Sequence, residues 1–549
     1  MSLDSTRPRG PQDDAAPKLV RRGALTWLSV LALASALAGG RSSSAAEITW
    51  GTSGGGALED YGWAVAADRS DNALVAGHFT GPANFGTATL GQSALLDVFV
   101  AKYDALGRFV WVRAAGGPGD DDARAVAADG QGNVFVTGSF SSRATFGQVT
   151  LAGTGTLDMY LAKYSPEGVV RWVAQAGGSG RNEGGGVAVD AAGNCTVTGY
   201  FSGTASFDAT KLTSQGALDL FIARYDSAGK LLWARSAGGA GQEEANAVAV
   251  DTEGNGVVTG SFYEAANFDG RSIQSLGGRD VFLAKYDPTG KLLWVRRAGG
   301  ADPRGTDNGL GVATDFEGSI FVTGSFGSDA SFEQVTLLHH GGGDIFVAKY
   351  SSRGSLLWAH RFGGPGPDQG HSVGVDANGD VYVTGFFLGS VAFGPNVFTS
   401  PGHADVFVVK LDTTGKLLWA LPASGSAYKS GNGIAVTPAG ACFITGFFRG
   451  TTAFGSFTLT NNFSSNRDPF IARVDGPPSL PRLSIARAGN AVVVSWPASP
   501  AGFVLESGNR LPPDISWTAV SGVPAPSGSR RTVTSEASGL GTFYRLRSR

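Results

Sequence analysis

The sequence has few charged residues and almost no cysteine. Only 16 % of its 549 residues are Asp, Glu, Lys or Arg, and the two cysteines are Cys195 and Cys442. Two cysteines in a chain of this length exclude a small disulfide scaffold. A hydrophobic share of 42 % with so little charge excludes a disordered chain. The protein must therefore be stabilised by packing, and its 83 glycines indicate many tight turns between short strands.

The sequence also lacks the short motifs of common enzymes and of metal or nucleic-acid sites. It contains no Gly-x-Ser-x-Gly elbow, no His-Glu-x-x-His pair and no phosphate-binding loop. The acidic run Asp120–Asp122 does not have the alternation of a calcium loop, and no spacing of histidines requires a transition metal. The net charge of −3 comes without a basic patch. We therefore expect no cofactor, no bound metal and no nucleic-acid partner.

Residues 1–46 have the pattern of an export signal. A basic stretch ends in two arginines, an apolar run follows at 24–38, and small residues at 44–46 are suitable for cleavage. The apolar run is shorter than the roughly 20 residues that span a membrane. The paired arginines resemble a twin-arginine signal, but Ala24 stands where that signal usually has a bulky residue. We expect ordinary secretion in preference to twin-arginine export, and a mature protein that is secreted, periplasmic or at the cell surface, without a transmembrane segment.

A repeat of about 61 residues fills most of the remaining chain. Three markers each recur seven times, namely a Trp, the Gly of a Val-Thr-Gly-like segment, and an Asp that opens a strand-like run. The tryptophans are Trp50, Trp111, Trp172, Trp233, Trp294, Trp358 and Trp419. The glycines are Gly77, Gly138, Gly199, Gly260, Gly324, Gly385 and Gly446. The aspartates are Asp97, Asp158, Asp219, Asp280, Asp344, Asp405 and Asp468.

Each repeat contains four strand-like runs, which in the fourth copy are 247–251, 256–262, 281–287 and 292–297. Val, Phe, Tyr and Trp are enriched in these runs, and Gly and Asp separate them, which indicates antiparallel β-structure. Four strands repeated seven times predict an all-β fold, a seven-bladed β-propeller with four-stranded blades. We expect the first run, rich in Ala and Gly, to be innermost and the Trp run to be outermost, where the ring covers the joint with the next blade.

The two ends of the repeat array complement each other. The last copy ends at Asp475 without a Trp run, whereas an additional run, Ile48-Thr49-Trp50, precedes the first copy. We therefore predict that the N-terminal strand completes the last blade and leaves no open edge.

These residues resemble a known repeat family. The segment DVFLAKYDPTGKLLWVRRAGG, Asp280–Gly300, with AVAVD and GNGVVTGSF before it, resembles the bacterial β-propeller repeat called SBBP, found in exported and surface proteins. The resemblance covers residues 48–475 and implies the propeller fold, but no single activity. AKYDPTGKLLW also resembles the tryptophan-docking motif of quinone-cofactor dehydrogenases and of outer-membrane assembly propellers. The adjacent cysteines of those dehydrogenases are absent here, so we interpret this likeness as shared blade packing.

The repeat stops after Gly476-Pro477-Pro478, and a second module fills the remainder. Its short strand-like runs predict a small β-sandwich that resembles fibronectin type III or immunoglobulin-like modules. The predicted domains are thus a signal peptide at 1–46, a propeller at 47–475 and a sandwich-like module at 476–549.

The loops of the predicted propeller fall on two faces. Connections from the first to the second strand and from the third to the fourth are short, uniform turns on one face. The longer connections share the opposite face, where we expect any ligand to bind. One polar position recurs on this long-loop face, eight residues before the end of each inner strand. Its residues are Asp60, Asp121, Asn182, Glu243, Asp307, Asp368 and Lys429.

This ring has two interpretations. It forms a polar rim at the mouth of the central channel that binds a cation or a basic or hydroxyl-rich ligand, or each side chain binds the backbone of its own loop or of a neighbouring blade. With no catalytic constellation in the sequence, our leading hypothesis is an exported, monomeric, non-enzymatic binding or scaffold protein whose long-loop face takes a protein or glycan ligand. The alternative is a secreted polysaccharide-processing enzyme with carboxylates on that face.

Overall fold

The computed structural model describes residues 45–91, 93, 95–461, 466–477, 481–488, 491–498, 503–508, 517–520, 524–527, 530–536 and 542–548. All regular secondary structure in these residues is β-strand. The predicted signal peptide lies outside them except for Ala45 and Ala46. Within these ranges there is no helix of the length and apolarity that a membrane span requires.

Seven repeat units, numbered here in chain order by their first strand, account for the described residues up to 475. The first strands are β2 (Tyr61–Ala67), β8 (Asp121–Ala128), β14 (Asn182–Val189), β20 (Glu243–Val250), β26 (Asn308–Thr314), β32 (Asp368–Val375) and β38 (Lys429–Val436). The second strands are β3 (Ala73–Phe79), β9 (Val134–Phe140), β15 (Cys195–Phe201), β21 (Gly256–Phe262), β27 (Ile320–Phe326), β33 (Val381–Phe387) and β39 (Cys442–Phe448). First and second strands pair antiparallel in every unit. In units 2 to 6 the turn between them has an Asp that accepts backbone N–H groups and a Gly with a positive φ, as at Asp251 and Gly254.

The third and fourth strands complete an antiparallel sheet in each unit. The third strands are β6 (Asp97–Tyr103), β12 (Asp158–Tyr164), β18 (Asp219–Tyr225), β24 (Asp280–Tyr286), β30 (Asp344–Tyr350), β36 (Asp405–Leu411) and β42 (Asp468–Asp475). The fourth strands of units 1 to 6 are β7 (Phe109–Gly116), β13 (Val170–Gly178), β19 (Leu231–Gly239), β25 (Leu292–Gly300), β31 (Leu356–Phe362) and β37 (Leu417–Gly425).

In unit 7 the fourth strand comes from the other end of the repeat array. Strand β1 (Glu47–Gly56) pairs antiparallel with β42, with Trp50 opposite Arg473 and Ser53 opposite Phe470. The predicted pairing of the N-terminal strand with the last unit is therefore present.

The four predicted strands are present in every unit, but the sheet has four strands with the Trp strand outermost only in unit 5, and the other six sheets have two more strands. The connection between second and third strands forms a β-hairpin, which lies on the fourth strand of the preceding unit. The hairpins are β4–β5 (Ala83–Phe85, Ala88–Leu90), β10–β11 (Arg143–Phe146, Val149–Ala152), β16–β17 (Thr204–Phe207, Thr210–Thr213), β22–β23 (Ala265–Phe268, Arg271–Gln274), β28–β29 (Ala330–Phe332, Val335–Leu337), β34–β35 (Ser390–Phe393, Asn396–Thr399) and β40–β41 (Thr451–Phe454, Phe457–Thr460). Six hairpins extend the preceding sheet to six strands, while β34–β35 is joined to unit 5 by a single bridge at Gly363. The physical reason is that the fourth strand would otherwise present an open edge.

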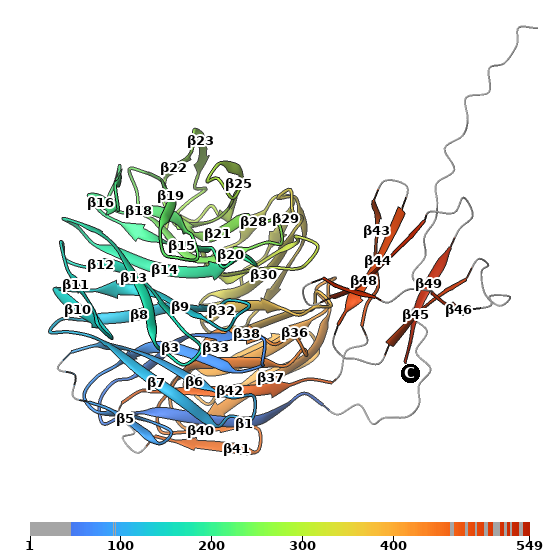
Figure 1. Ribbon diagram of the computed structural model, residues 1–549, viewed down its shortest axis with the longest axis horizontal. Helices are drawn as coiled ribbons and strands as arrows, with labels where there is room; N and C mark the ends of the chain where they lie inside the picture. Colours follow the sequence, from blue (N-terminus) through green and yellow to red (C-terminus); the bar gives the residue numbers. More distant parts are fainter. Residues whose placement is uncertain are drawn as a thin grey trace, which may run out of the picture.

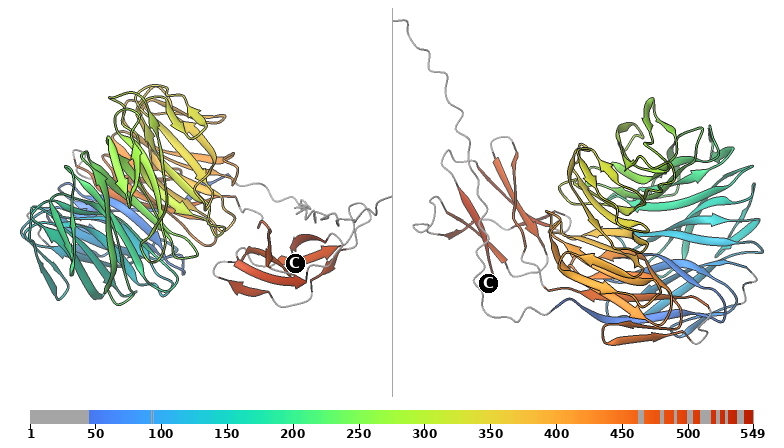
Figure 2. Two further views of the ribbon diagram at one scale, coloured as in Figure 1. Left: turned by 90° about the horizontal axis from the view of Figure 1, so that it is seen from above. Right: turned by 180° about the vertical axis from the view of Figure 1, so that it is seen from behind.

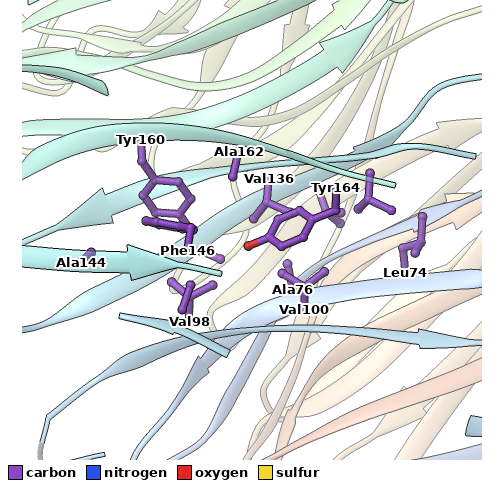
Figure 3. Close-up of a cluster of buried hydrophobic side chains, with 14 of the residues drawn as sticks. Leu74, Ala76, Val98, Val100, Val136, Ala144, Phe146, Tyr160, Ala162 and Tyr164 are labelled. Carbon is purple, nitrogen blue, oxygen red and sulfur yellow. The ribbon is translucent and has the colours of Figure 1, made fainter. Parts of the chain in front are cut away.

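Each hairpin also fills the joint between units. Its first strand ends in a buried Phe, such as Phe146 and Phe268, and the following residue has a positive φ, as in Gly147 and Asp269. Figure 3 shows the first joint, where Phe146 lies against Tyr160 of β12 with ring centroids 4.6 Å apart. The hydrophobic core is thus divided into clusters, each shared by adjacent sheets.

Among the described residues, six of the seven recurring tryptophans donate their indole N–H to the next unit, Trp419 being the exception. Trp111 donates its indole N–H to the carbonyl of Pro166 in the next unit at 3.0 Å, and its ring lies against Gly168. Trp50, on β1, binds Ala105 of unit 1 in the same way. The same link therefore joins the last sheet to the first.

The seven sheets surround a common centre. Each first strand contacts the first strand of the next unit, and β38 contacts β2. In Figure 1 the sheets follow one another in chain order from blue through green to orange, with the first and last side by side.

The C-terminal residues form two further sheets beside the seven (Figure 2). One has the order β43–β44–β48–β47 (Ser484–Ala488, Ala491–Pro497, Arg530–Glu536, Ala525–Ser527) and the other β46–β45–β49 (Thr518–Ala519, Phe503–Gly508, Phe543–Ser548). Val494, Trp496, Leu505, Val533 and Tyr544 form a buried cluster between them.

Candidate functional site

The predicted polar ring is buried. Asp60, Asp121, Asn182, Glu243, Asp307, Asp368 and Lys429 are all at most 1 % exposed. Each stands at or just before the start of a first strand, where the chain turns inward from the preceding sheet. None of the seven lines the cavity at the channel mouth described below.

The side chains of this ring bind loop backbone. Asp60 accepts the N–H groups of Gly56 at 2.7 Å and Thr80 at 2.8 Å. Asp307 accepts those of Gly300 and Gly327 in the same manner. These bonds join the connection that enters a first strand to the connection that leaves the second strand. The alternative interpretation, in which each side chain binds loop backbone, therefore accounts for these hydrogen bonds, while ligand binding by this ring stays a prediction.

Six of the seven ring residues also lie near a carboxyl group of the preceding third strand. A Cβ added to Gly55 would lie 2.5 Å from Asp468 Oδ1 and 2.9 Å from Asp60 Oδ2, so both carboxyls converge on this glycine. Burial and then the charge of Asp60 raise the pKa of Asp468 to about 8. Burial and then the charge of Asp97 raise the pKa of Asp121 to about 8. A buried acid pair of this kind holds a proton at neutral pH, because two adjacent carboxylates repel each other.

At two of the seven ring positions the residue is not an acid. Asn182 carries a neutral amide where five other units have an acid, and it donates to the carbonyl of Leu157 at 3.2 Å. At unit 7, Lys429 Nζ lies 2.5 Å from Asp405 Oδ1, and both side chains are fully buried. The break in the acidic series at Lys429 is therefore a buried ion pair.

A second ring, which the sequence analysis missed, does reach the channel. Every first strand has a β-bulge, seen as a one-residue shift of register, as between Gly62 and Ala64. A bulge adds one residue and redirects its side chain. The bulge residues are Trp63, Arg124, Gly185, Asn246, Leu310, His371 and Asn432. All seven line one cavity.

This cavity is the mouth of the channel at the start of the first strands, the face that carries the long connections. Its volume is about 390 Å³, within the range of about 300 to 1,000 Å³ that ligand pockets occupy. Besides the bulge residues, its polar lining includes Arg181, Glu183, Tyr200, Glu244 and Gln369.

The charges in the mouth are internally paired. Arg124 Nε lies 2.6 Å from Asp122, Arg181 pairs with Glu183, and Glu244 pairs with Arg279. These pairs occupy units 2, 3 and 4 and their connections. The two arginines and two glutamates that line the cavity balance in formal charge.

An aromatic cluster from units 7 and 1 and the connection between units 6 and 7 lies beside the mouth, and of its side chains Trp63 lines the cavity. The rings of Trp63 and Tyr61 are stacked with their centroids 5.4 Å apart. The centroid of the Tyr61 ring lies 4.8 Å from that of Phe447. Phe447 in turn stacks with Tyr428, which is 36 % exposed. The Arg124 guanidinium lies over the Trp63 ring, 4.5 Å from its centroid, so this aromatic cluster contacts one of the ion pairs of the mouth.

The remaining chemistry-bearing residues lie elsewhere or are buried. Cys195 and Cys442 are free and fully buried, and burial raises the pKa of Cys195 to about 12. His371 is the only histidine of the cavity lining, and burial lowers its pKa. Across the ranges that the structure describes, no group of three or more His, Cys, Asp or Glu side chains is arranged to hold a metal ion.

Comparisons with known proteins support the repeat assignment. A family model described as a beta-propeller repeat, SBBP, matches residues 110–139 and 357–385. An uncharacterized WD repeat-containing protein of Acanthamoeba polyphaga mimivirus, L264, is 24 % identical over 73 % of this chain and 36 % of its own length. The regulatory protein FlaEY of Caulobacter vibrioides is 32 % identical over 20 % of this chain and 12 % of its own length. The chain thus spans only about a third and an eighth of these two relatives.

Two solved structures are similar at a low level. Sqt1 from Chaetomium thermophilum is 11 % identical with a TM-score of 0.38, covering 82 % of this chain and 97 % of Sqt1. A puromycin hydrolase mutant is 12 % identical with a TM-score of 0.33, covering 79 % of this chain and 58 % of the hydrolase. Neither likeness bears on the function proposed below. The repeat and the family match define the chain as a β-propeller repeat protein.

Proposed function

We propose that this chain is an exported, non-enzymatic binding or scaffold protein, and that its ligand enters the channel mouth of a seven-bladed propeller. The seven sheets are the blades, and strand β1 closes the ring by pairing with β42. The two C-terminal sheets are a small sandwich. The domain limits are those expected from the sequence, 1–46, 47–475 and 476–549.

The observation that carries this proposal is the ring of bulge residues. The repeat is nearly uniform elsewhere, with the same Trp, Gly and Asp at each position of the pattern. At the bulge, however, the residue changes between most units, from Trp63 to Arg124, Gly185 and Leu310. A position that is structurally equivalent and chemically varied, and that points into one cavity, is suited to recognition of an asymmetric ligand.

The C-terminal module supports the choice of face. Arg530 donates to the carbonyl of Ala377 at 2.7 Å and lies over the Phe316 ring at 5.4 Å. Ala377 and Phe316 line the cavity at the opposite end of the channel. The module therefore stands against the short-turn face, and the described residues leave the long-loop mouth clear of it.

The contacts of the lining carboxylates favour binding over hydrolysis. Glu183 and Glu244 are each paired with an arginine. A glycosidase needs two carboxyl groups that are free to act as acid and as base or nucleophile. Turnover of a chromogenic glycoside by the mature chain, lost on Glu183→Gln or Glu244→Gln, would overturn the non-enzymatic assignment.

The proposal is tested by filling each end of the channel in turn. Leu310→Trp introduces at unit 5 the side chain that unit 1 carries naturally at the equivalent position, Trp63. The matched control is Ala192→Trp at the opposite mouth. Residues 47–549 and both variants are applied to glycan and peptide arrays. We expect Leu310→Trp to abolish binding and Ala192→Trp to preserve it, and the reverse pattern contradicts the proposal.

A further inference from the structure

We infer that the long-loop mouth binds the terminal residue of a neutral glycan. The inference rests on the proposed function and adds to it the chemical class of the ligand and the part of it that enters. Three features of the mouth support it, namely its lining from all seven units, its balanced charge and its combination of hydrogen-bonding and aromatic side chains.

The closed outline selects a chain end. One bulge residue from each of the seven units lines the cavity, so side chains surround it on every side. The innermost strands contact each other in an unbroken circle around the opening. An internal segment of a polymer cannot pass through such an opening sideways. Only a terminal residue or a short branch reaches its floor.

The balanced charge selects an uncharged ligand. Arg124 and Arg181 are neutralised by Asp122 and Glu183, and Glu244 is neutralised by Arg279. Because each of these charges already has a partner of opposite sign, the mouth presents no net charge that would attract an anionic or a cationic ligand. A neutral ligand instead bonds to the lone pairs and N–H groups that remain free in each pair.

The polar side chains of the lining are suited to hydrogen bonds with hydroxyl groups. Amide side chains come from units 4, 6 and 7, where Asn246, Gln369 and Asn432 line the cavity. Asn246 and Asn432 each donate to a backbone carbonyl of the next unit, at 2.9 Å in both cases, which fixes their orientation. Amide, guanidinium and carboxylate groups together offer donors and acceptors in adjacent pairs. A sugar, whose hydroxyls both donate and accept, satisfies these donors and acceptors more completely than a ligand that can only donate or only accept hydrogen bonds.

Two aromatic side chains of the lining supply the apolar contact that a sugar ring needs. Trp63 and Tyr200 line the cavity from units 1 and 3. Tyr61 and Arg124 hold Trp63 in place by stacking, at 5.4 Å and 4.5 Å from its ring. The side chain is therefore ordered before ligand arrives, which lowers the entropy cost of binding.

The test uses the mature chain, residues 47–549, on an array of oligosaccharides that differ in terminal residue and charge. Binders are then titrated in solution by calorimetry. We expect neutral glycans with a shared terminal sugar to bind, with less than a twofold change in affinity between about 50 and 500 mM salt, because no charge is transferred.

Two substitutions locate the binding. We expect Trp63→Ala and Gln369→Ala each to weaken it tenfold or more. The control is Tyr263→Ala, since this half-buried aromatic stacks on Arg279 but does not line the cavity. Circular dichroism and the melting temperature confirm that each variant is folded.

The outcomes separate this inference from the proposed function. Binding of only uronic-acid glycans or only peptides, lost on Trp63→Ala, overturns the neutral-glycan inference and preserves the mouth as the binding site. Glycan binding that is unchanged by Trp63→Ala, Gln369→Ala and Leu310→Trp overturns both. The absence of any glycan binding overturns the inference alone.

Discussion

Removal of the Lys429 side-chain charge should destabilise the propeller more than any exposed substitution. Lys429 Nζ lies 2.5 Å from Asp405, and both side chains have no exposed surface. Lys429→Met keeps most of the apolar volume but leaves Asp405 buried without its cation. Losing one partner of a buried ion pair costs about 3 to 5 kcal/mol. With an unfolding entropy of about 2 cal/mol/K per residue over 47–475, this lowers Tm by about 3 to 6 °C.

The loss of stability caused by Lys429→Met should increase with pH. Without Lys429, burial raises the pKa of Asp405 further above its value in the unfolded chain. The neutral carboxyl then contributes stability that is fully present below about pH 4 and is lost as the pH rises through the folded pKa. The deficit of Lys429→Met relative to wild type is therefore expected to be smaller at pH 5 than at pH 8.

Differential scanning calorimetry at both pH values measures this deficit. The control is Lys230→Met, because Lys230 lies exposed in a short turn and should change Tm by less than about 1 °C. An unchanged Tm for Lys429→Met, or an equal deficit at both pH values, would refute the reasoning.

Three further outcomes are expected. Asp121→Asn copies the amide found naturally at Asn182. Burial raises the pKa of Asp121 to about 8, so the native state holds a proton that the unfolded state releases above about pH 4. In urea denaturation, the free energy of unfolding of the variant should therefore exceed that of wild type by about 1 to 3 kcal/mol at pH 9 and equal it at pH 4. Deletion of Glu47–Gly51 removes the outer partner of β42, so limited proteolysis should cleave unit 7 first, and unchanged protease resistance and Tm would contradict the pairing. Cys195 and Cys442 are free and fully buried, so a thiol reagent should modify neither in the native protein and both in denaturant; rapid native labelling would show that these strands are not in the core.

Much of the fold could be predicted from the repeat because its markers are local. The Trp of the fourth strand, the turn Asp and Gly, and the short apolar runs each follow from strand and turn chemistry within about ten residues. The pairing of β1 with β42 was also predictable, since a missing run at one end matched an extra run at the other. The hairpins also have a sequence signal, namely a Phe before a Gly or Asp in six of the seven units, as at Phe146-Gly147 and Phe207-Asp208.

The site could be predicted only in part. Loop length predicts the long-loop face as the place for a ligand, which stays a prediction. The polar ring expected there is buried, and Asp60 and Asp307 in it bind backbone N–H groups. The residues that reach the cavity lie three positions further along, as Trp63 and Leu310 do, and strand alternation alone does not single them out. A bulge is a property of how two strands pair, so its location is not visible in one strand's sequence.

The sequence alone determined the number and order of the units, the strands within them and the residue that docks each unit on the next, because these depend on interactions between neighbours in the chain. Only the tertiary structure decided which polar side chains are buried at the junctions and which enter the channel. That distinction depends on seven strands that are far apart in sequence but meet at one axis, where a single added residue in each turns a side chain from the sheet toward the opening.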